Sequence, residues 1–254
     1  MKYLLTFILL PALIFSQEIS LVGTSNIDAE KFIGIDTYDN LYYIKDEILF
    51  KKTNSSVYNF KDFQLGELYS VDIINPMNIA VYYQDFNVVV LLDNKLSEID
   101  RINFNSIYEF INSSHVAIAA NTNLWVFNLN SQQLELYDYR SQSKRILSQP
   151  INGEVIELVS NINYCFLMTE RYIRAYNIYG SLIAKIPNKG YQKIIQVNEN
   201  IIVKRDNSLY YINMETQETI KINSPEISIK DLQHKQEFLY IYDENQVSKF
   251  KLTF

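Results

Sequence analysis

The sequence predicts an all-β fold: a β-propeller of six blades, each with about four antiparallel strands. Three observations support this prediction: a repeated pattern, a regular period, and an incomplete last copy that the start of the chain can complete. Each copy has a short apolar run, an Asn or Asp turn, and an aromatic or β-branched run. The copies read FIGIDTYDNLYYI, IAVYYQDFNVVVLLD, HVAIAANTNLWVFNL, YCFLMTERYIRAYNI, NIIVKRDNSLYYINM and EFLYIYDENQVSKFK. Short strands repeated with a period of about 40 residues are typical of propellers.

The spacing of the copies agrees with the size of a propeller blade. We take as anchor the residue that opens the second run of each copy. The anchors are Asn40, Asn87, Asn123, Arg171, Asn207 and Asn245. The intervals between them scatter around the blade period, and we attribute the first and third, which are the longest, to loop insertions. Helical solenoids have similar periods, but runs such as 88–92 and 124–129 are too short for helices and rich in strand-forming residues.

Polar turns divide each copy into strands. Asn or Asp precedes most anchors and tolerates left-handed backbone, so we expect hairpins there between the second and third strands. A second turn follows and leads to a more polar run, such as LIAKIP or TIKIN, which has the alternation of an outer strand with one wet face. The predicted order is therefore inner, middle, middle, outer. We interpret 54–56 and 141–149 as polar loops; strands hidden there would raise the blade count to seven.

The last copy breaks off before its outer strand. A spare strand-like segment, EISLVG at 18–23, lies near the start of the chain. Pairing this segment with the C-terminal strand would close the ring and remove an exposed sheet edge. We therefore predict a propeller that is closed by its N- and C-terminal strands.

The first residues, MKYLLTFILLPALIFSQ, have the pattern of a secretory signal peptide. The apolar run is shorter than a membrane span requires. We expect residues 1–17 to be a signal peptide and residues 18–254 to be a single propeller domain. The protein is then exported to the periplasm or to the periplasmic face of the outer membrane, with release from the cell as the less favoured alternative. The single cysteine, Cys165, is expected in a buried strand and can form no intrachain disulfide.

The charge distribution indicates which partners the protein binds. The formal net charge is −6, and no cluster of Lys and Arg exceeds a pair. Nucleic-acid binding and adsorption to anionic lipid both need a basic surface, so the sequence argues against both. We expect a protein partner in the cell envelope.

The sequence contains no recognisable catalytic constellation. Only two histidines exist; His115 should begin a strand and His234 should lie in a polar loop, each as a structural residue. A propeller glycoside hydrolase or lyase would need two acids facing a central cavity. Five acids fall near strand ends, where we interpret them as turn formers: Asp36, Asp72, Asp85, Asp206 and Asp243. We therefore predict that the protein is not an enzyme, and we predict no catalytic, cofactor or metal site.

Aromatic residues are abundant, with 20 Tyr and 14 Phe but one Trp. Those in strands, such as Tyr42 and Tyr82, should pack in the core. Those in loops, for example Tyr58, Tyr108 and Tyr191, should be exposed. Exposed tyrosine on a rigid frame is favoured at protein interfaces. A carbohydrate-binding module with coplanar exposed rings is the alternative.

Four stretches of the chain are distinctive: the signal ending IFSQ, GIDTYDNLYY, NPMNIAVYYQDFNVVVLLDNKLSEIDRINF and LWVFNLNSQQLELYDYR. They resemble a family of exported, propeller-like proteins of flavobacteria, within the Bacteroidetes. The resemblance implies an exported propeller and carries over no functional residue. Periplasmic propeller-like accessory subunits occur in outer-membrane machineries of this phylum, including the type IX secretion translocon. By analogy of compartment and fold, the resemblance implies an interaction or accessory subunit of an outer-membrane export or assembly complex.

Overall fold

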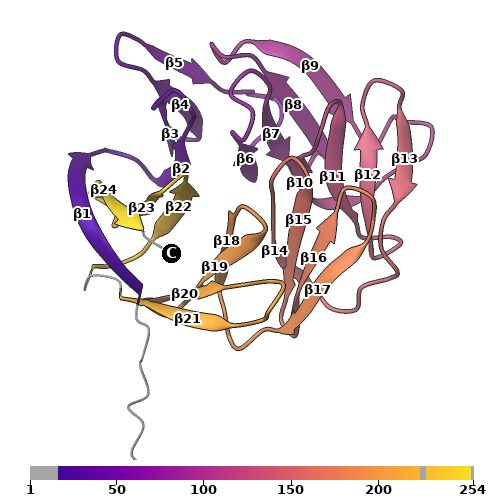
Figure 1. Cartoon of the computed structure of the whole chain (residues 1–254). Helices are drawn as coiled ribbons and strands as arrows, with labels where there is room; N and C mark the ends of the chain where they lie inside the picture. Colours follow the sequence, from indigo (N-terminus) through magenta and orange to yellow (C-terminus); the bar gives the residue numbers. More distant parts are fainter. Residues whose placement is uncertain (1–16, 224–226, 253–254) are drawn as a thin grey trace, which may run out of the picture.

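The computed structural model describes residues 17–223 and 227–252, which form 24 β-strands and no helix. The strands build six sheets arranged around a central axis, so the prediction of a six-bladed propeller is confirmed (Figure 1). Residues 1–16 of the predicted signal peptide lie outside the described part of the chain, and Gln17 begins the first strand. Among the described residues, no helix is long and apolar enough to span a membrane.

The first three blades follow each other along the chain. Blade 1 contains β2 (Lys31–Ile35), β3 (Leu41–Lys45), β4 (Ile48–Lys52) and β5 (Val57–Phe60). Blade 2 contains β6 (Ser70–Asp72), β7 (Ile79–Tyr83), β8 (Val88–Leu92) and β9 (Glu98–Asn103). Blade 3 contains β10 (Ser113–Ile118), β11 (Asn123–Asn128), β12 (Gln133–Asp138) and β13 (Ser143–Ile146).

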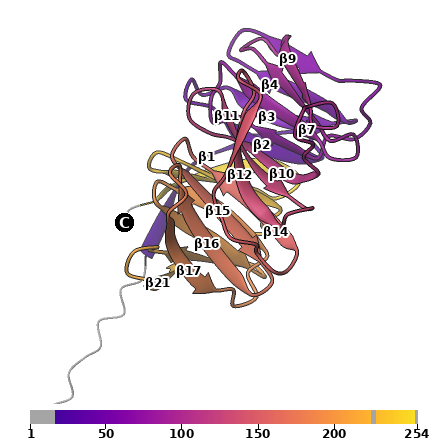
Figure 2. The same cartoon turned by 90° about the vertical axis from the view of Figure 1, so that its right-hand side faces the viewer.

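The other three blades complete the ring, and Figure 2 shows the strands of blade 4 side by side in chain order. Blade 4 contains β14 (Val155–Ser160), β15 (Tyr164–Thr169), β16 (Tyr172–Asn177) and β17 (Leu182–Pro187). Blade 5 contains β18 (Lys193–Val197), β19 (Asn200–Arg205), β20 (Ser208–Ile212) and β21 (Thr219–Asn223). Blade 6 contains β22 (Asp231–Lys235), β23 (Phe238–Tyr242), β24 (Gln246–Leu252) and, from the start of the chain, β1 (Gln17–Asn26).

The predicted closure of the ring is confirmed. Strand β1 pairs antiparallel with β24, from Ile19 opposite Leu252 to Asn26 opposite Gln246. Figure 1 shows the two strands side by side, in indigo and yellow. The first residues of β1 also pair in parallel with β21, with Gln17 opposite Ile222, so one chain segment completes blade 6 and joins it to blade 5.

The antiparallel order of the strands gives the ring two different faces. The first strand of each blade lies nearest the axis, and all six first strands run in the same direction. We call "loop face" the side that carries the connections between blades and the turns between second and third strands. We call "turn face" the opposite side, which carries the turns between first and second strands and between third and fourth strands.

The predicted repeats begin one strand too early in blades 1 and 3. Asn40 and Asn123 lie between the first and second strands, whereas the other anchors lie between the second and third. The long intervals therefore reflect this offset and not loop insertions: with Glu47 and Gln132 as anchors the intervals become more even. Of the two segments interpreted as polar loops, 141–149 contains the outer strand β13, and 54–56 leads directly into the outer strand β5. These two strands are the fourth strands of blades 3 and 1, so they do not add a seventh blade.

The core consists of six apolar clusters, one at each interface between neighbouring blades. Strands β7 and β8 are buried along their whole length because blades cover both of their faces. Cys165 is buried in β15, as predicted. The smallest described cluster lies between blades 6 and 1 and contains Phe32, Tyr240, Tyr242 and Val247 as its buried members. The closing interface is therefore the one with the least apolar packing.

Hydrogen bonds near the axis tie the blades together in pairs. In every second blade, a side-chain oxygen of the first strand accepts a hydrogen bond from a backbone N–H of the next blade's first strand. The three bonds are each 2.7 Å long and join Ile118 N to Asp72 Oδ2, Ile194 N to Glu157 Oε2, and Ile35 N to Gln233 Oε1. Each acceptor satisfies a donor that the strand ladder leaves open. The three hydrogen bonds connect blade 2 with blade 3, blade 4 with blade 5, and blade 6 with blade 1.

Replacing Gly34 with Ala is expected to destabilise the protein by about 1–3 kcal/mol, the usual range for overpacking. A Cβ atom at Gly34 would lie 2.6 Å from Gln233 Nε2, and both polar ends of the Gln233 side chain are hydrogen-bonded to Ile35. The substitution must therefore break the pair that joins blades 6 and 1. Chemical denaturation measures the loss. Gly23→Ala is the matched control, since that position has open space, and it should change the stability little.

Candidate functional site

The five acids noted in the sequence do not form a catalytic pair. Asp36 lies in the turn after β2 and Asp72 ends β6, while the other three occupy turns of three different blades. Those three are Asp85 in blade 2, Asp206 in blade 5 and Asp243 in blade 6. Asp243 has the predicted role, since its Oδ1 accepts hydrogen bonds from the backbone N–H groups of Asn245 and Gln246.

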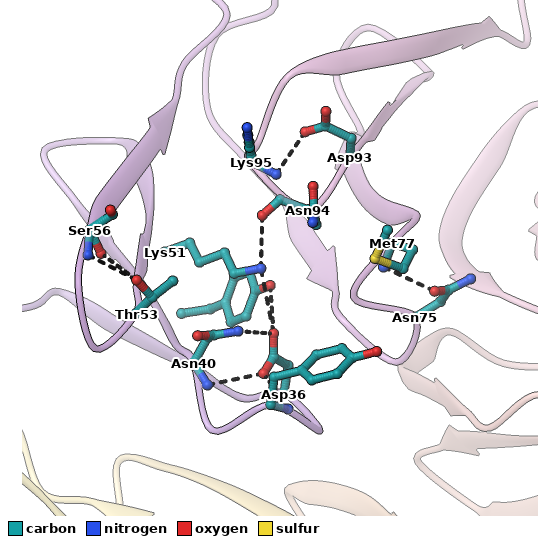
Figure 3. A network of polar contacts seen from close by, with 12 residues as sticks. Asp36, Asn40, Lys51, Thr53, Ser56, Asn75, Met77, Asp93, Asn94 and Lys95 are labelled. Atoms are coloured by element: carbon teal, nitrogen blue, oxygen red, sulfur yellow. Dashed lines mark hydrogen bonds and ion pairs between the residues drawn. The ribbon is translucent and has the colours of Figure 1, made fainter.

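Asp36 belongs to a buried network between blades 1 and 2 (Figure 3). Its carboxylate accepts hydrogen bonds from the backbone and side-chain N–H groups of Asn40 and from the Tyr42 hydroxyl, and Lys51 Nζ lies 3.6 Å away. Lys51 also donates to the carbonyl of Asn94 in blade 2, at 2.9 Å. Burial alone would raise the pKa of Asp36, but these hydrogen bonds hold it below its usual value. The network connects blade 1 to blade 2 through the bond from Lys51 to Asn94.

Charged residues missed in the sequence gather where the first strands begin. Lys193 Nζ lies 2.5 Å from Asp231 Oδ1, and Glu157 lies close enough to interact electrostatically with both. Burial raises the pKa of Glu157 to about 7, against the opposing effects of Lys193 and of the hydrogen bond from Ile194 N. The sequence signal for this group was at least one charged residue in each of three first strands, which becomes meaningful only once the ring order is known.

Both histidines lie on first strands near the axis. His115, on β10, has Nε2 3.1 Å from the Tyr69 hydroxyl and Nδ1 3.0 Å from Ser114 Oγ. His234 lies on β22, so its placement in a polar loop was wrong; the segment is polar because it lines the axis. Burial lowers the pKa of each to about 4. Among residues 17–223 and 227–252, no three or more His, Cys, Asp and Glu side chains cluster in a way that could hold a metal ion.

Replacing Glu157 with Gln is expected to stabilise the protein more at pH 8 than at pH 4.5. The folded chain keeps a proton on Glu157 up to about pH 7, while the unfolded chain loses it near the usual pKa of 4.5. The contribution of Glu157 to the free energy of unfolding is therefore fully present below pH 4.5 and is lost as the pH rises to about 7. Gln can still accept the hydrogen bond from Ile194, as Gln233 does from Ile35.

The measurement is the difference in Tm between the Glu157→Gln variant and the original protein from pH 4.5 to pH 8. We compare the two proteins at each pH because both contain His115 and His234, whose effect on stability is opposite to that of Glu157. The lowered pKa values of these histidines reduce the stability of both proteins as the pH falls from 6.5 to 4. A difference that stays constant over this range would contradict the assignment of the raised pKa to Glu157.

The tyrosines expected in loops have three different environments. Tyr108 is 98% exposed, as predicted. Tyr58 lies on β5 and packs partly against the cluster between blades 1 and 2. Tyr191 is buried, contrary to the prediction, because the loop between blades 4 and 5 folds inward and its ring packs in their shared core. The strand residue Tyr82 is buried, as expected.

Five large apolar side chains are exposed on the loop face over blades 1 to 3, and we call them the loop-face patch. Their exposed fractions range from 46% to 98%. They are Phe63, Phe86, Tyr108, Phe110 and Leu129. Single exposed apolar residues are normal, so the notable feature is that all five lie on the loop face of neighbouring blades.

Hydrogen bonds join the segments that carry four of the five side chains of the loop-face patch, Phe86, Tyr108, Phe110 and Leu129. Asn105 Nδ2 donates to Phe86 O at 2.8 Å, Asn87 Nδ2 donates to Ile111 O at 2.6 Å, and Leu129 N donates to Asn112 O at 2.8 Å. These bonds connect two turns of blades 2 and 3 with the loop between the blades. The patch is therefore displayed on a fixed frame, which reduces the entropy lost when a partner binds.

The surroundings of the loop-face patch are acidic. Glu67 and Asp85 are exposed in the same loops and turns, and Glu109 is exposed but pairs with Lys144 at 3.7 Å. The bases Lys61 and Arg101 form ion pairs with neighbouring carboxylates. Glu67 and Asp85 therefore leave this apolar surface with an excess of negative charge.

No protein-family model and no curated protein matches the chain. Solved structures with the same fold do match. A streptogramin B lyase aligns with a TM-score of 0.59 and 11% identity over 91% of this chain and 98% of that one. The Pan2 WD40 domain of Neurospora crassa aligns with a TM-score of 0.59 and 8% identity over 92% and 95%. Virginiamycin B lyase of Staphylococcus aureus aligns at 0.60 and 9% over 87% and 79%. At such identities the likeness shows the propeller fold alone.

Proposed function

We propose that the protein is a non-catalytic interaction subunit of the cell envelope, which binds a basic and apolar segment of a partner protein at the loop-face patch. The observation that supports this proposal is the set of five exposed apolar side chains on the loop face, four of them on segments joined by hydrogen bonds. The acidic surroundings favour a basic partner by electrostatic attraction. The export expected from residues 1–17 supports the envelope as the compartment.

Affinity capture from detergent-solubilised envelopes tests the proposal. The original protein should recover a partner, and the double variant Tyr108→Ser/Phe110→Ser should lose it, because both side chains belong to the loop-face patch. The matched control, Tyr38→Ser/Met77→Ser, removes two exposed apolar side chains from the turn face and should leave the recovery unchanged.

The partner should also be released by raised salt, since exposed charges more than a Debye length apart are largely screened. Recovery of the protein alone, or equal recovery of a partner by the original protein and both variants, would count against the proposal. The identity of the captured partner decides whether the complex is an outer-membrane export machinery such as the type IX secretion translocon.

A further inference from the structure

A polar groove lies on the turn face between blades 3 and 4, on the side opposite the loop-face patch. It has a volume of about 460 Å³, within the range of small-molecule sites. Its lining comes from turns of both blades and from the outer strands of blade 3. The polar and aromatic side chains that define it are Asn121, Asn123, Asp138, Arg145, Asn163 and Tyr179.

The walls of the groove are fixed by hydrogen bonds across the two blades. Arg145 Nη2 of blade 3 donates to Ile178 O of blade 4 at 2.6 Å, and Ile178 N donates to Asn163 O at 2.8 Å. In the turn after β16, Asn177 Oδ1 accepts hydrogen bonds from Tyr179 N and Ser181 N. These bonds order the backbone of the turn, and the Tyr179 side chain, which lines the groove, is 80% exposed and accessible to a ligand.

Amide groups inside the groove are available for a ligand. Within the described part of the chain, the side chains of Asn121 and Asn163 make no hydrogen bond. Each amide offers two donors and one acceptor, which suits the hydroxyl groups of a polyol, since a hydroxyl both donates and accepts. Arg145 keeps further N–H donors beyond the one bound to Ile178.

The charges in the groove nearly cancel. Lys144 is shared between the carboxylates of Glu109 and Glu135, at 3.7 and 3.6 Å, and the Asp138 carboxylate offsets Arg145. The groove therefore lacks the cluster of unpaired cations that would suit a phosphate or a nucleic acid, among the residues that line it. A neutral ligand with many hydroxyl groups fits best.

We propose that this groove binds a short neutral saccharide, independently of the loop-face patch. One sugar ring places its C–H face against the Tyr179 ring. Asn121, Asn163 and Arg145 bond the hydroxyl groups. Hydrogen bonds across the two blades fix Arg145 and the backbone of the turns that carry the other groups, which limits the entropy lost on binding.

A printed array of neutral and uronate-containing oligosaccharides tests the proposal with the full protein. Neutral glycans should be retained, and titration calorimetry with the best of them should give a Kd for the original protein. Tyr179→Ala and Asn163→Ala should each weaken binding at least about tenfold, which corresponds to roughly 1.4 kcal/mol. Tyr38→Ala is the matched control, because Tyr38 is an exposed tyrosine on the turn face outside the groove, and it should bind as the original protein does.

Thermal unfolding of each variant separates a loss of binding from a loss of folding; exposed Tyr179 and Asn163 should change Tm little. An array without neutral hits, retention of acidic glycans only, or unchanged affinity of Tyr179→Ala would each overturn the proposal. Loss of the protein partner in the envelope capture leaves it intact, since the two surfaces lie on opposite faces.

Discussion

A variant that begins at Ile27, and so lacks β1, is expected to lose its cooperative unfolding transition or to keep it only at a much lower temperature. Strand β1 supplies the outer strand of blade 6 and a parallel bridge to β21 of blade 5. A net backbone hydrogen bond stabilises by roughly 1 kcal/mol, so losing this ladder costs on the order of 5 kcal/mol. That is comparable to the whole stability of many domains. Urea denaturation followed by circular dichroism measures the effect.

Two further measurements separate the strand from its side chains. Leu21→Ser/Val22→Ser changes two exposed side chains of β1 but keeps its backbone, and it should cost less than about 1 kcal/mol. A synthetic peptide of residues 17–26 should restore stability to the shortened protein in proportion to its concentration, by adding a strand to the open edge. A shortened protein as stable as the original would show that the ring does not depend on β1.

The fold could be predicted because the middle strands carry most of its information. Strands such as β7 and β8 are buried on both faces, so their sequences are almost wholly apolar and recur in each copy. The outer strands β5 and β13 could not be recognised in this way. They are short, with the sequences VYNF and SKRI, and their side chains are largely exposed. Packing selects only weakly for residue type at an exposed edge, so the polar strand SKRI looks like a loop, and VYNF is too short to stand out.

The functional residues were harder to predict than the fold. Glu157, Lys193 and Asp231 meet because three first strands converge on the axis, although each is a whole blade away from the next along the chain. Likewise, the loop-face patch and the groove each combine side chains from neighbouring blades. Composition pointed to exposed tyrosine, and Tyr108 and Tyr179 are exposed, but only the closed ring shows that they lie on opposite faces.

Replacing Asp36 with Ala is expected to cost about 3–5 kcal/mol, the range measured when one partner of a buried ion pair is removed. The Asp36 side chain is fully buried and that of Lys51 is 4% exposed. Without the carboxylate, the Lys51 ammonium is left with Asn94 O as its one hydrogen-bond acceptor, and the Tyr42 hydroxyl loses its acceptor. Tm should fall by roughly 10 °C for a domain of this size.

Asp93→Ala is the matched control for this prediction. Asp93 occupies the corresponding kind of turn in blade 2 and accepts hydrogen bonds from Lys95 N and Ser97 N, while the buried Lys51 ammonium bonds the carbonyl of the neighbouring Asn94 (Figure 3). Its loss should cost about 1 kcal/mol, the value of an ordinary turn hydrogen bond. If the two variants lost equal stability, the turn alone would explain the role of Asp36.

The double variant Asp36→Ala/Lys51→Met decides whether the buried charge is the dominant cost. It removes the Lys51 ammonium together with its partner, the Asp36 carboxylate. The methionine keeps an apolar side chain of similar length between blades 1 and 2. Exchanging a whole buried ion pair for apolar groups is often close to neutral, so the double variant should be more stable than Asp36→Ala alone. A double variant less stable than Asp36→Ala would instead show that the bond from Lys51 to Asn94 O, which joins blades 1 and 2, contributes more stability than the unpaired charge costs.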